Sequence, residues 1–304
     1  MNVLVTGGAG FIGSHIVDML IKEGNKVSII DSLVHGRLEN INGEVNFYNM
    51  DIRDSNVSNV FEIERPDMII HEAAQISVEK SIKNPIYDAD VNIIGTLNIL
   101  ENIAKFKTQK IIYPSSAAIY GEPKYLTIRE DQPHNMESGY GISKNTIEQY
   151  LEVYKKLYGI DYTILCYSNV YGLRQDSLGE GGVVSIFCKR LLSNKVPYIF
   201  GDGGQTRDFV YVKDVARANI MAMKDKGSNF YNVCSNTETS INELLDIMSK
   251  IEGEKILPVH LPKRGGDIRC SVMTYEKINK EVGWQPSYSL IDGLKQTFEY
   301  YRKI

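Results

Sequence analysis

The sequence lacks the features that mark membrane or nucleic-acid-binding proteins. Its 304 residues carry 34 Lys and Arg against 38 Asp and Glu, and the charges are interspersed, so no basic stripe indicates nucleic acid or an anionic membrane surface. No apolar run approaches the roughly 18 residues of a membrane span. The first apolar stretch runs straight into glycines, without a cleavage-like segment. We therefore expect a cytoplasmic protein with no membrane or nucleic-acid partner.

Cysteine is also scarce. Cys166, Cys188, Cys234 and Cys270 are far apart, form no C-x-x-C pair and are mostly flanked by apolar residues. This spacing favours buried thiols over a disulfide framework or a zinc site. We expect no bound metal.

What the sequence does contain is enough apolar material for a sizeable core, at 43% hydrophobic residues. Short β-rich runs alternate with longer stretches of helical spacing, and several runs are apolar without alternation, as in strands buried on both faces. This rhythm predicts an α/β fold with a doubly wound, Rossmann-like parallel sheet. The predicted strands are 2–6, 26–30, 45–48, 67–71, 110–114 and 162–166.

The organisation of the chain changes after about residue 168, where the alternation loosens. We expect residues 1–167 to form a dinucleotide-binding domain and residues 168–304 to form a smaller C-terminal substrate domain. Two later strand-like runs, 209–212 and 230–234, indicate that the chain returns to the first sheet near 208–234. The second domain would then be discontinuous.

A glycine-rich turn directly follows the first predicted strand. Gly7, Gly10 and Gly13 recur at a spacing of three and open a helix, so the backbone can turn tightly and approach a pyrophosphate at the helix N-terminus. Asp31 ends the second strand, where a carboxylate can accept both ribose hydroxyls of an adenosine and repel a 2′-phosphate. The pattern predicts NAD rather than NADP. An ordinary turn beside a strand-end aspartate is the alternative.

A second constellation combines a phenol, an ammonium and a hydroxyl. Tyr140 and Lys144 are four residues apart, so on a helix both project from one face. A fixed cation favours the phenolate of a nearby tyrosine. Ser115 and Ser116 end the preceding strand, where parallel-sheet active sites collect. Together these residues predict hydride transfer at a secondary alcohol or ketone, whereas an exposed aromatic and a solvated lysine would be the structural alternative.

Several motifs resemble those of a known superfamily. Residues 6–13 read T-G-G-A-G-F-I-G and are similar to the T-G-G-x-G-F-I-G signature of extended short-chain dehydrogenases/reductases. Residues 115–121 read S-S-A-A-I-Y-G and most resemble the S-S-A-x-V-Y-G segment of UDP-hexose 4-epimerases in the NAD-dependent epimerase/dehydratase family. The resemblance covers nearly the whole chain. One departure is Cys166, which replaces the family's usual arginine.

The resemblance implies which residues contact NAD. Asp51, after the third strand, would bind the adenine amino group, and the turn after the fourth strand would lie beside the cofactor. The implied cofactor-binding set is Gly7, Gly10, Phe11, Ile12, Gly13, Asp31, Asp51, Ile52, Ala73, Ala74, Gln75, Ser115, Tyr140 and Lys144.

The resemblance also implies a site for the UDP-sugar substrate. Arg207 and Arg264 would grip the diphosphate, Asn169 would donate to it, and Asp267 would hold the uridine-side ribose. A net acidic protein needs a few well-positioned cations to bind a diphosphate. Arginine suits this role because the forked donors of its guanidinium match phosphate oxygens. The implied substrate-binding set is Ser116, Tyr140, Asn169, Arg207, Arg264, Asp267 and Ser271.

Two alanines separate this chain from its relatives. Nucleotide-sugar 4,6-dehydratases carry an Asp-Glu pair where this chain has Ala117 and Ala118, and UDP-glucuronate decarboxylases usually carry a glutamate at the second position. Methyl groups cannot transfer protons, which leaves epimerisation or simple redox chemistry. The implied catalytic residues are Tyr140 as the base at the sugar O4, Ser116 as a hydrogen-bond partner of O4, and Lys144 as the group that holds Tyr140 and the nicotinamide ribose.

The resulting hypothesis is an NAD-dependent 4-epimerase that passes through a transient 4-keto sugar. At positions 269 and 271 the chain has Arg269 and Ser271, and this pair resembles that of epimerases that accept N-acetylated hexoses. We therefore expect both plain and N-acetylated UDP-hexoses to react. UDP-glucuronate 4-epimerase, 4-keto-sugar reductase and a non-catalytic NAD-sensing protein are the alternatives.

The resemblance to the family further implies that the protein assembles as a homodimer. One candidate face comprises Ile93, Leu97 and Leu100, and the other is the helix around residues 150–158. Ordinary core packing would explain either set equally well.

Overall fold

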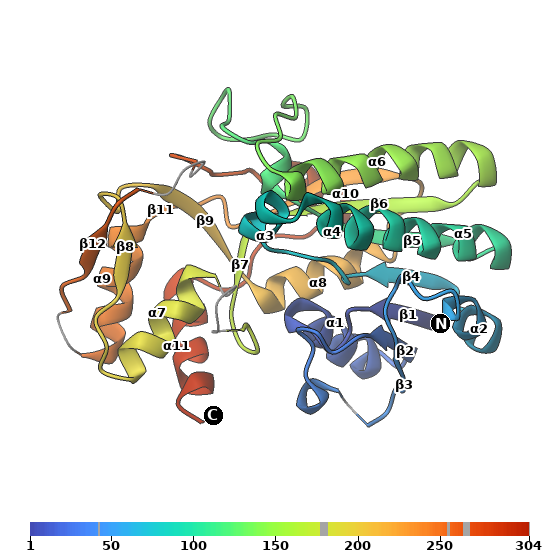
Figure 1. Cartoon of the computed structure of the whole chain (residues 1–304), viewed down its shortest axis with the longest axis horizontal. Helices are drawn as coiled ribbons and strands as arrows, with labels where there is room; N and C mark the ends of the chain where they lie inside the picture. The colour runs from blue at the N-terminus through green and yellow to red at the C-terminus, as the bar shows by residue number, and fades with distance from the viewer. Residues whose placement is uncertain (42, 177–181, 254–255, 264–267, 304) are drawn as a thin grey trace. The chain divides into compact units, whose positions relative to one another are not determined.

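The structure is a computed structural model that describes residues 1–41, 43–176, 182–253, 256–263 and 268–303 (Figure 1). By its internal contacts the chain divides into two compact units. Unit 1 comprises Met1–Ile119, Met136–Cys166 and Ala216–Tyr231, and unit 2 comprises Tyr120–Asn135, Tyr167–Val215 and Asn232–Ile304.

Unit 1 is built on a seven-stranded sheet in the order β10-β6-β5-β4-β1-β2-β3. The pairs β1–β2, β1–β4, β2–β3 and β4–β5 are parallel. The order from β3 through β1 to β6 is that of doubly wound nucleotide-binding sheets, so the predicted fold class is confirmed. The strands are β1 (Asn2–Thr6), β2 (Lys26–Asp31), β3 (Asn46–Asn49), β4 (Met68–His71), β5 (Lys110–Ser116), β6 (Asp161–Tyr167) and β10 (Asn229–Val233).

The helical elements that accompany this sheet lie between its strands in the chain. The segment from α4 to α5 is helical throughout, but its middle part, η2, is a π-helical turn. The elements are α1 (Phe11–Lys22), η1 (Leu38–Asn40), α2 (Val57–Glu64), α3 (Val78–Lys83), α4 (Pro85–Ala89), η2 (Asp90–Gly95), α5 (Thr96–Phe106), η3 (Ala117–Ile119), α6 (Gly139–Tyr158) and α8 (Val212–Ala222).

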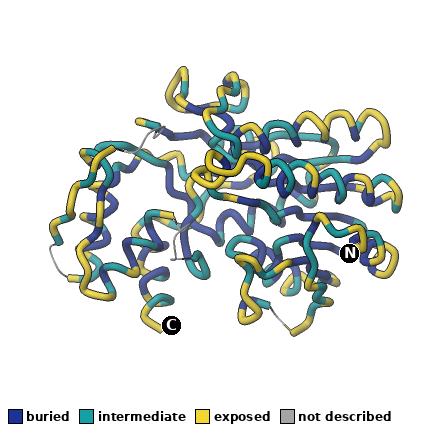
Figure 2. The backbone as a smooth tube through the Cα atoms, viewed as in Figure 1, coloured by how far each residue is buried: buried dark blue, intermediate teal, exposed yellow. Residues whose placement is uncertain are grey.

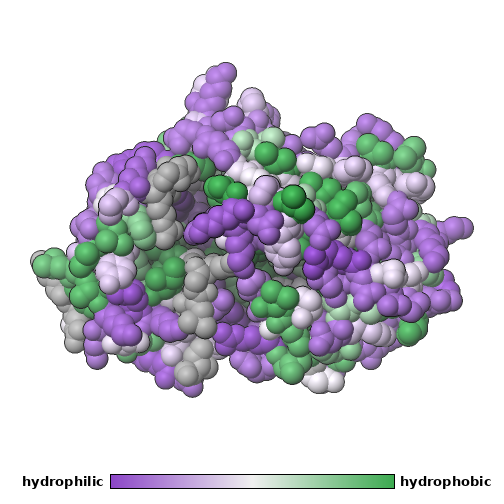
Figure 3. Space-filling view, viewed as in Figure 1, coloured by the Kyte–Doolittle hydropathy of each residue, from purple (hydrophilic) through white to green (hydrophobic). Residues whose placement is uncertain are grey.

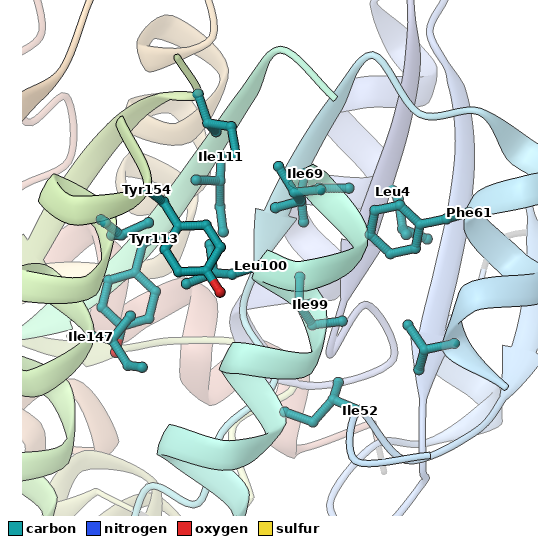
Figure 4. Packing of buried hydrophobic residues seen from close by; sticks show 14 of the residues in the cluster. Leu4, Ile52, Phe61, Ile69, Ile99, Leu100, Ile111, Tyr113, Ile147 and Tyr154 are labelled. Carbon is teal, nitrogen blue, oxygen red and sulfur yellow. The ribbon is translucent and has the colours of Figure 1, made fainter. Parts of the chain in front are cut away.

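Both faces of the sheet are buried. On one face, Leu4, Ile69 and Ile111 pack with residues of α2, α5 and α6 in a single apolar cluster (Figure 4). Their neighbours along the same strands, such as Val5 and Ile70, point to the opposite face and are also fully buried. Figure 2 shows these strands as buried stretches, with exposed residues on the outer turns of the helices. This explains why the strands read as continuous apolar runs in the sequence.

Unit 2 contains two small sheets. The three-stranded sheet has the order β11-β9-β7, in which β7 and β9 are parallel and β11 is antiparallel to β9. Of the two late strands anticipated in the sequence, β10 joins the large sheet beside β6, whereas β9 lies in this smaller one. The elements are β7 (Asn169–Tyr171), α7 (Val183–Leu192), β8 (Tyr198–Phe200), β9 (Thr206–Tyr211), β11 (Glu238–Ser240), α9 (Ile241–Glu252), β12 (Val259–Leu261), α10 (Glu276–Val282) and α11 (Leu290–Tyr301).

The expectation of buried thiols holds for three of the four cysteines. All four are free thiols, three of them are buried and Cys270 is half-buried. Within the described ranges, no helix is long and apolar enough to cross a membrane.

Candidate active site

The glycine-rich turn connects β1 to α1. Gly7 has a φ of 70°, and a Cβ at this position would lie 2.7 Å from the Ala73 backbone nitrogen, so only glycine fits. Gly10 is the N-cap of α1 and offers no side-chain cap, Gly13 is buried in the first turn, and that turn contains no acidic residue. A helix N-terminus without a competing cap or acid is suited to a phosphate group.

Asp31 lies at the end of β2, as predicted. Its carboxylate accepts hydrogen bonds from the Ala9 backbone N–H at 3.0 Å and from the Leu33 backbone N–H at 2.8 Å. Burial raises the pKa of this carboxyl, and the two backbone hydrogen bonds act in the opposite direction. An ionised carboxylate has about four lone-pair sites. Asp31 therefore keeps acceptor capacity for ribose hydroxyls.

The other residues predicted to contact the adenosine differ in burial and in hydrogen bonding. Asp51 accepts from Arg53 Nε at 2.9 Å and from Arg53 Nη2 at 2.8 Å, and these bonds hold the pKa of Asp51 below its usual value. The Ile52 side chain is buried in the unit 1 core. Phe11 and Ile12 are half-buried at the start of α1. The carboxylate of Asp51 is thus ionised and fixed in place.

The turn after β4 is held by a buried polar network that includes Gln75. The Gln75 backbone N–H donates to Asn92 Oδ1 at 2.8 Å, and Asn92 Nδ2 donates back to the Gln75 carbonyl at 2.9 Å. Gln75 Nε2 donates to Asp88 Oδ1 at 2.6 Å. Ala73 and Ala74, which precede Gln75, are half-buried.

Sequence reasoning did not identify Asp88 or Asn92. They lie in α4 and the π-helical turn η2, and both are 2% exposed. Asn92 also donates to the Ser143 hydroxyl at 3.2 Å, and Ser143 donates to the Tyr140 carbonyl at 3.0 Å. The network therefore reaches the helix that carries the predicted base. π-helical turns often occur at functional sites, but no simple sequence pattern reveals them.

The three predicted catalytic residues lie together at the end of β5 and the start of α6. The Ser116 hydroxyl hydrogen-bonds to Tyr140. Lys144 Nζ donates to the Pro114 carbonyl at 2.9 Å and lies 5.9 Å from the centroid of the Tyr140 ring. Gly141 lets the start of α6 lie close to η3, because a Cβ at this position would lie 2.6 Å from the Ala118 carbonyl oxygen.

The protonation states differ from the simplest expectation. The sequence suggested that Lys144 lowers the pKa of Tyr140, but burial dominates and raises that pKa to about 12, although the hydrogen bond from Ser116 acts to lower it. Burial also lowers the pKa of Lys144 to about 8, and the charges of Glu72, Asp88 and Glu148 oppose this fall. Tyr140 is therefore a neutral phenol in the protein alone.

In unit 2, Asn169 and Arg207 lie on one face of the three-stranded sheet. Asn169 of β7 pairs with Phe209 of β9, and Arg207 is two residues before Phe209, so all three side chains share a face. Asn169 is exposed. Arg207 Nη1 donates to the carbonyls of Thr206 at 2.7 Å and Ile268 at 2.8 Å.

The segment that carries Ser271 runs beside β9. The Arg269 carbonyl accepts from the Thr206 N–H at 2.9 Å, and the Met273 N–H donates to Asp208 Oδ2 at 3.3 Å. Ser271, between these contacts, is 8% exposed. Arg207 and Ser271 are therefore brought together in this unit. Arg264 and Asp267 lie outside the described residues.

Asp208 is a further buried residue that sequence reasoning missed. Besides the Met273 N–H, it accepts from the Ser235 N–H at 2.7 Å, the Ser235 hydroxyl at 2.8 Å and the Asn236 N–H at 3.0 Å. Burial raises its pKa to about 6 despite these donors. The residue next to Arg207 is thus the anchor of several loops, and the sequence contains no signal for that role.

A doubly wound sheet that carries a glycine-rich turn and a Ser-Tyr-Lys constellation is typical of short-chain dehydrogenases/reductases. The chain belongs to the NAD dependent epimerase/dehydratase family, whose family model matches residues 3–234.

Known proteins resemble the chain over its full length. It is 46% identical to a putative UDP-glucose 4-epimerase of Methanocaldococcus jannaschii, covering 99% of this chain and 98% of the relative. A crystal structure of UDP-glucose 4-epimerase from Thermotoga maritima with UDP-glucose superposes with a TM-score of 0.98 at 45% identity, covering 100% of this chain and 99% of the other. UDP-N-acetylglucosamine 4-epimerase of Methanobrevibacter ruminantium, in complex with UDP-N-acetylmuramic acid, gives 0.95 at 34% identity, covering 99% and 98%.

Proposed function

We propose that the protein is an NAD-dependent 4-epimerase of UDP-hexoses. The observation that carries the proposal is the meeting of Ser116, Tyr140 and Lys144 beside two alanines, Ala117 and Ala118. The first three can oxidise and reduce a secondary alcohol with a nicotinamide, and the alanines offer no carboxylate for elimination or decarboxylation. The similarity to UDP-glucose 4-epimerases across the whole chain supports the same activity.

Each catalytic side chain has a proposed task at C4 of the hexose. Tyr140 takes the proton from O4 and later returns it, while Ser116 hydrogen-bonds to O4. Lys144 favours the phenolate of Tyr140 and binds the nicotinamide ribose. Bound NAD would accept the hydride from C4 and return it, and the positive charge of its oxidised ring would favour the phenolate.

The proposed NAD contacts all belong to unit 1. Phosphate binds at the N-terminus of α1, and Asp31 accepts the ribose hydroxyls because it keeps free acceptor capacity. Asp51 accepts from the adenine amino group. The remaining proposed contacts are Gly7, Gly10, Phe11, Ile12, Gly13, Ile52, Ala73, Ala74, Gln75, Ser115, Tyr140 and Lys144.

The proposed UDP contacts belong to unit 2. Arg207 binds the diphosphate, and Asn169, which shares its face of the sheet, donates to it. Arg264 and Asp267 are assigned to the diphosphate and the uridine-side ribose by resemblance alone. We further propose that Ser271 leaves room for an N-acetyl group on C2, so that UDP-N-acetylglucosamine and UDP-N-acetylgalactosamine also react.

We propose a homodimer as the assembly. Of the two candidate faces, the one with Ile93, Leu97 and Leu100 is weakened because Leu100 is fully buried in the core. On α6, Val153 is 45% exposed and Leu157 is 67% exposed, and apolar side chains reach the surface in this part of Figure 3. The α6 face is therefore the better candidate.

The proposal is tested with UDP-glucose, UDP-N-acetylglucosamine and UDP-glucuronate in separate incubations. NMR would follow the sugar protons while absorbance records free NADH. We expect the galacto isomers of the first two substrates without free NADH. Accumulation of NADH would instead indicate a dissociating dehydrogenase or reductase. Reaction of UDP-glucuronate alone would indicate the hexuronate epimerase, and no product from any substrate would contradict the proposal.

A further inference from the structure

Glu148 is a buried acid with no part in the mechanism above. It lies on α6 one turn after Lys144, and only 9% of the residue is exposed. The Ser115 hydroxyl donates to its carboxylate. Ser115 directly precedes Ser116, so Glu148 is one residue removed from a proposed catalytic hydroxyl.

Lys144 and Glu148 together hold the end of β5. Lys144 Nζ donates to the Pro114 carbonyl at 2.9 Å and lies 4.9 Å from the centroid of the Tyr113 ring, while Glu148 accepts from Ser115. Three consecutive strand residues are therefore bound by two oppositely charged side chains of one helix. A buried charge is stable only when such partners compensate for lost hydration.

The two charges also act on each other. The negative charge of Glu148 raises the pKa of Lys144, and Lys144 lowers that of Glu148, although burial lifts the Glu148 value to about 7. Burial raises the pKa of both Tyr113 and Tyr162, and the charge of Glu148 acts in the same direction. Both tyrosines therefore remain neutral near pH 7.

The other groups that face Lys144 have fixed roles. Glu72 and Asp88 raise its pKa as Glu148 does. His71 is fully buried, and burial lowers its pKa to about 3, so it carries no charge near pH 7. The three acids thus oppose the fall that burial causes in the pKa of Lys144, and one of them, Glu148, also binds the strand end next to Ser116.

We propose that Glu148 is a positioning residue, which fixes the Ser115–Ser116 strand end against α6 and places its carboxylate on the helix face that carries Lys144. Its effect on catalysis rests on the proposed function. Its effect on Lys144 can be measured without turnover, so the two proposals fail separately.

The test is Glu148→Gln, which keeps an acceptor oxygen for Ser115 but removes the charge. NMR of protein labelled with ¹³C at lysine Cε would give the pKa of Lys144, assigned by its absence in Lys144→Met. We expect that pKa to fall by about 1 in Glu148→Gln, because a nearby opposite charge is lost. The alkaline limb of the kcat profile should move to lower pH by a similar amount, with KM unchanged.

Glu152→Gln is the matched control. Glu152 lies one turn further along α6, is exposed, and bonds to Tyr162 and Lys156, so its loss should leave the Lys144 pKa and the kcat profile as in the wild type. A merely structural role for Glu148 would lower stability and activity at all pH values without moving the Lys144 titration.

Ser115→Ala is the second variant and makes a small change that the fold should tolerate. Without the Ser115 hydroxyl, the pKa of Glu148 should rise, so that near pH 7 the acid is protonated and Lys144 titrates at lower pH. An unchanged Lys144 pKa in both folded variants would overturn the proposal. A shifted pKa in a protein that does not epimerise UDP-hexoses would retain it and overturn the proposed function instead.

Discussion

The two units hold their candidate functional residues in different ways. In unit 1, Lys144 donates to a backbone carbonyl, but the buried side chains of Glu148 and Asn92 near it bond to other side chains. In unit 2, the side chain of Arg207 bonds to backbone carbonyls, and the neighbouring loops are gathered by one buried acid. The arrangement in unit 1 controls the protonation of the candidate catalytic residues. The arrangement in unit 2 controls the geometry of the candidate substrate-binding loops. We therefore expect variants of unit 1 to change chemistry and variants of unit 2 to change binding.

The network in unit 1 also fixes a histidine tautomer. The Thr96 hydroxyl donates to the Asn92 carbonyl at 2.7 Å, so His71 Nε2, which lies 2.9 Å from the Thr96 oxygen, must carry the proton and donate to it. His71 Nδ1 then accepts from the Thr6 hydroxyl at 2.8 Å. A neutral chain of hydrogen bonds thus joins β1, β4 and α5 behind the glycine-rich turn.

The largest expected effect belongs to Tyr140→Phe. Removal of the ionisable oxygen should lower kcat by about 1,000-fold, which lies within the usual range for loss of a general base. Binding of NAD, followed by fluorescence titration, should change little, because only one oxygen is lost. If NAD binding disappeared, Tyr140 would be a structural residue. The expectation that variants of unit 1 change the chemistry would then be wrong.

The counterpart in unit 2 is Arg207→Met. Loss of a charge-assisted contact with the diphosphate should raise KM for UDP-glucose by about 100-fold and leave kcat within a few fold. Steady-state kinetics on both parameters would check this. Arg190→Met is the control, because Arg190 lies on α7, where it stacks on Tyr198. A fall in kcat with constant KM would show that Arg207 acts in the chemical step. The expectation that variants of unit 2 change binding would then be wrong.

A smaller effect is expected from Asp208→Asn, measured as the pH dependence of stability. The folded pKa of about 6 lies above the unfolded value, so the folded state binds the proton more tightly. Asp208 therefore contributes stability that is fully present only below the unfolded pKa and is lost as the pH rises through the folded pKa of about 6. Between pH 4 and 7 the loss should be about 2 kcal/mol. The variant should lack this component in urea unfolding between pH 4 and 7. Parallel curves for the two proteins would contradict it.

The smallest effect is expected from Ser271→Tyr. A bulky side chain in place of a serine should lower kcat/KM for UDP-N-acetylglucosamine about 10-fold relative to UDP-glucose. The ratio of the two values, measured on one preparation, removes any general loss of activity. A ratio equal to that of the wild type would show that Ser271 does not limit the size of the C2 substituent.

The fold could be predicted because its signals are local. Apolar runs buried on both faces predicted the strands of the large sheet, and the structure moved their ends by one or two residues, as at Lys110–Ser116. Gly7 and Asp31 were found because a strand end followed by glycine or an acid is a short pattern. Ser116 was singled out because active sites collect at the carboxyl ends of parallel strands, and its hydrogen bond to Tyr140 is a tertiary contact.

The supporting residues of the site could not be predicted, because their roles depend on tertiary contacts. In the sequence, Glu148 looks like one half of an exposed i, i+4 pair with Lys144, yet both are buried against β5. Asn92 belongs to a π-helical turn inside an ordinary helical pattern. Asp208 follows Arg207 without any sign that several loops converge on it. Burial also decides the pKa of Tyr140, which spacing alone cannot reveal.

The central claim is that Tyr140 moves only the O4 proton while the hydrogen on C4 leaves and returns as hydride within one active site. The most direct measurement is conversion of UDP-glucose in D₂O, with NMR of the UDP-galactose formed. The account predicts that C4 of the product carries protium, because hydride does not exchange with solvent. Deuterium at C4 would contradict it, since Tyr140 or another base would then be removing a proton from carbon.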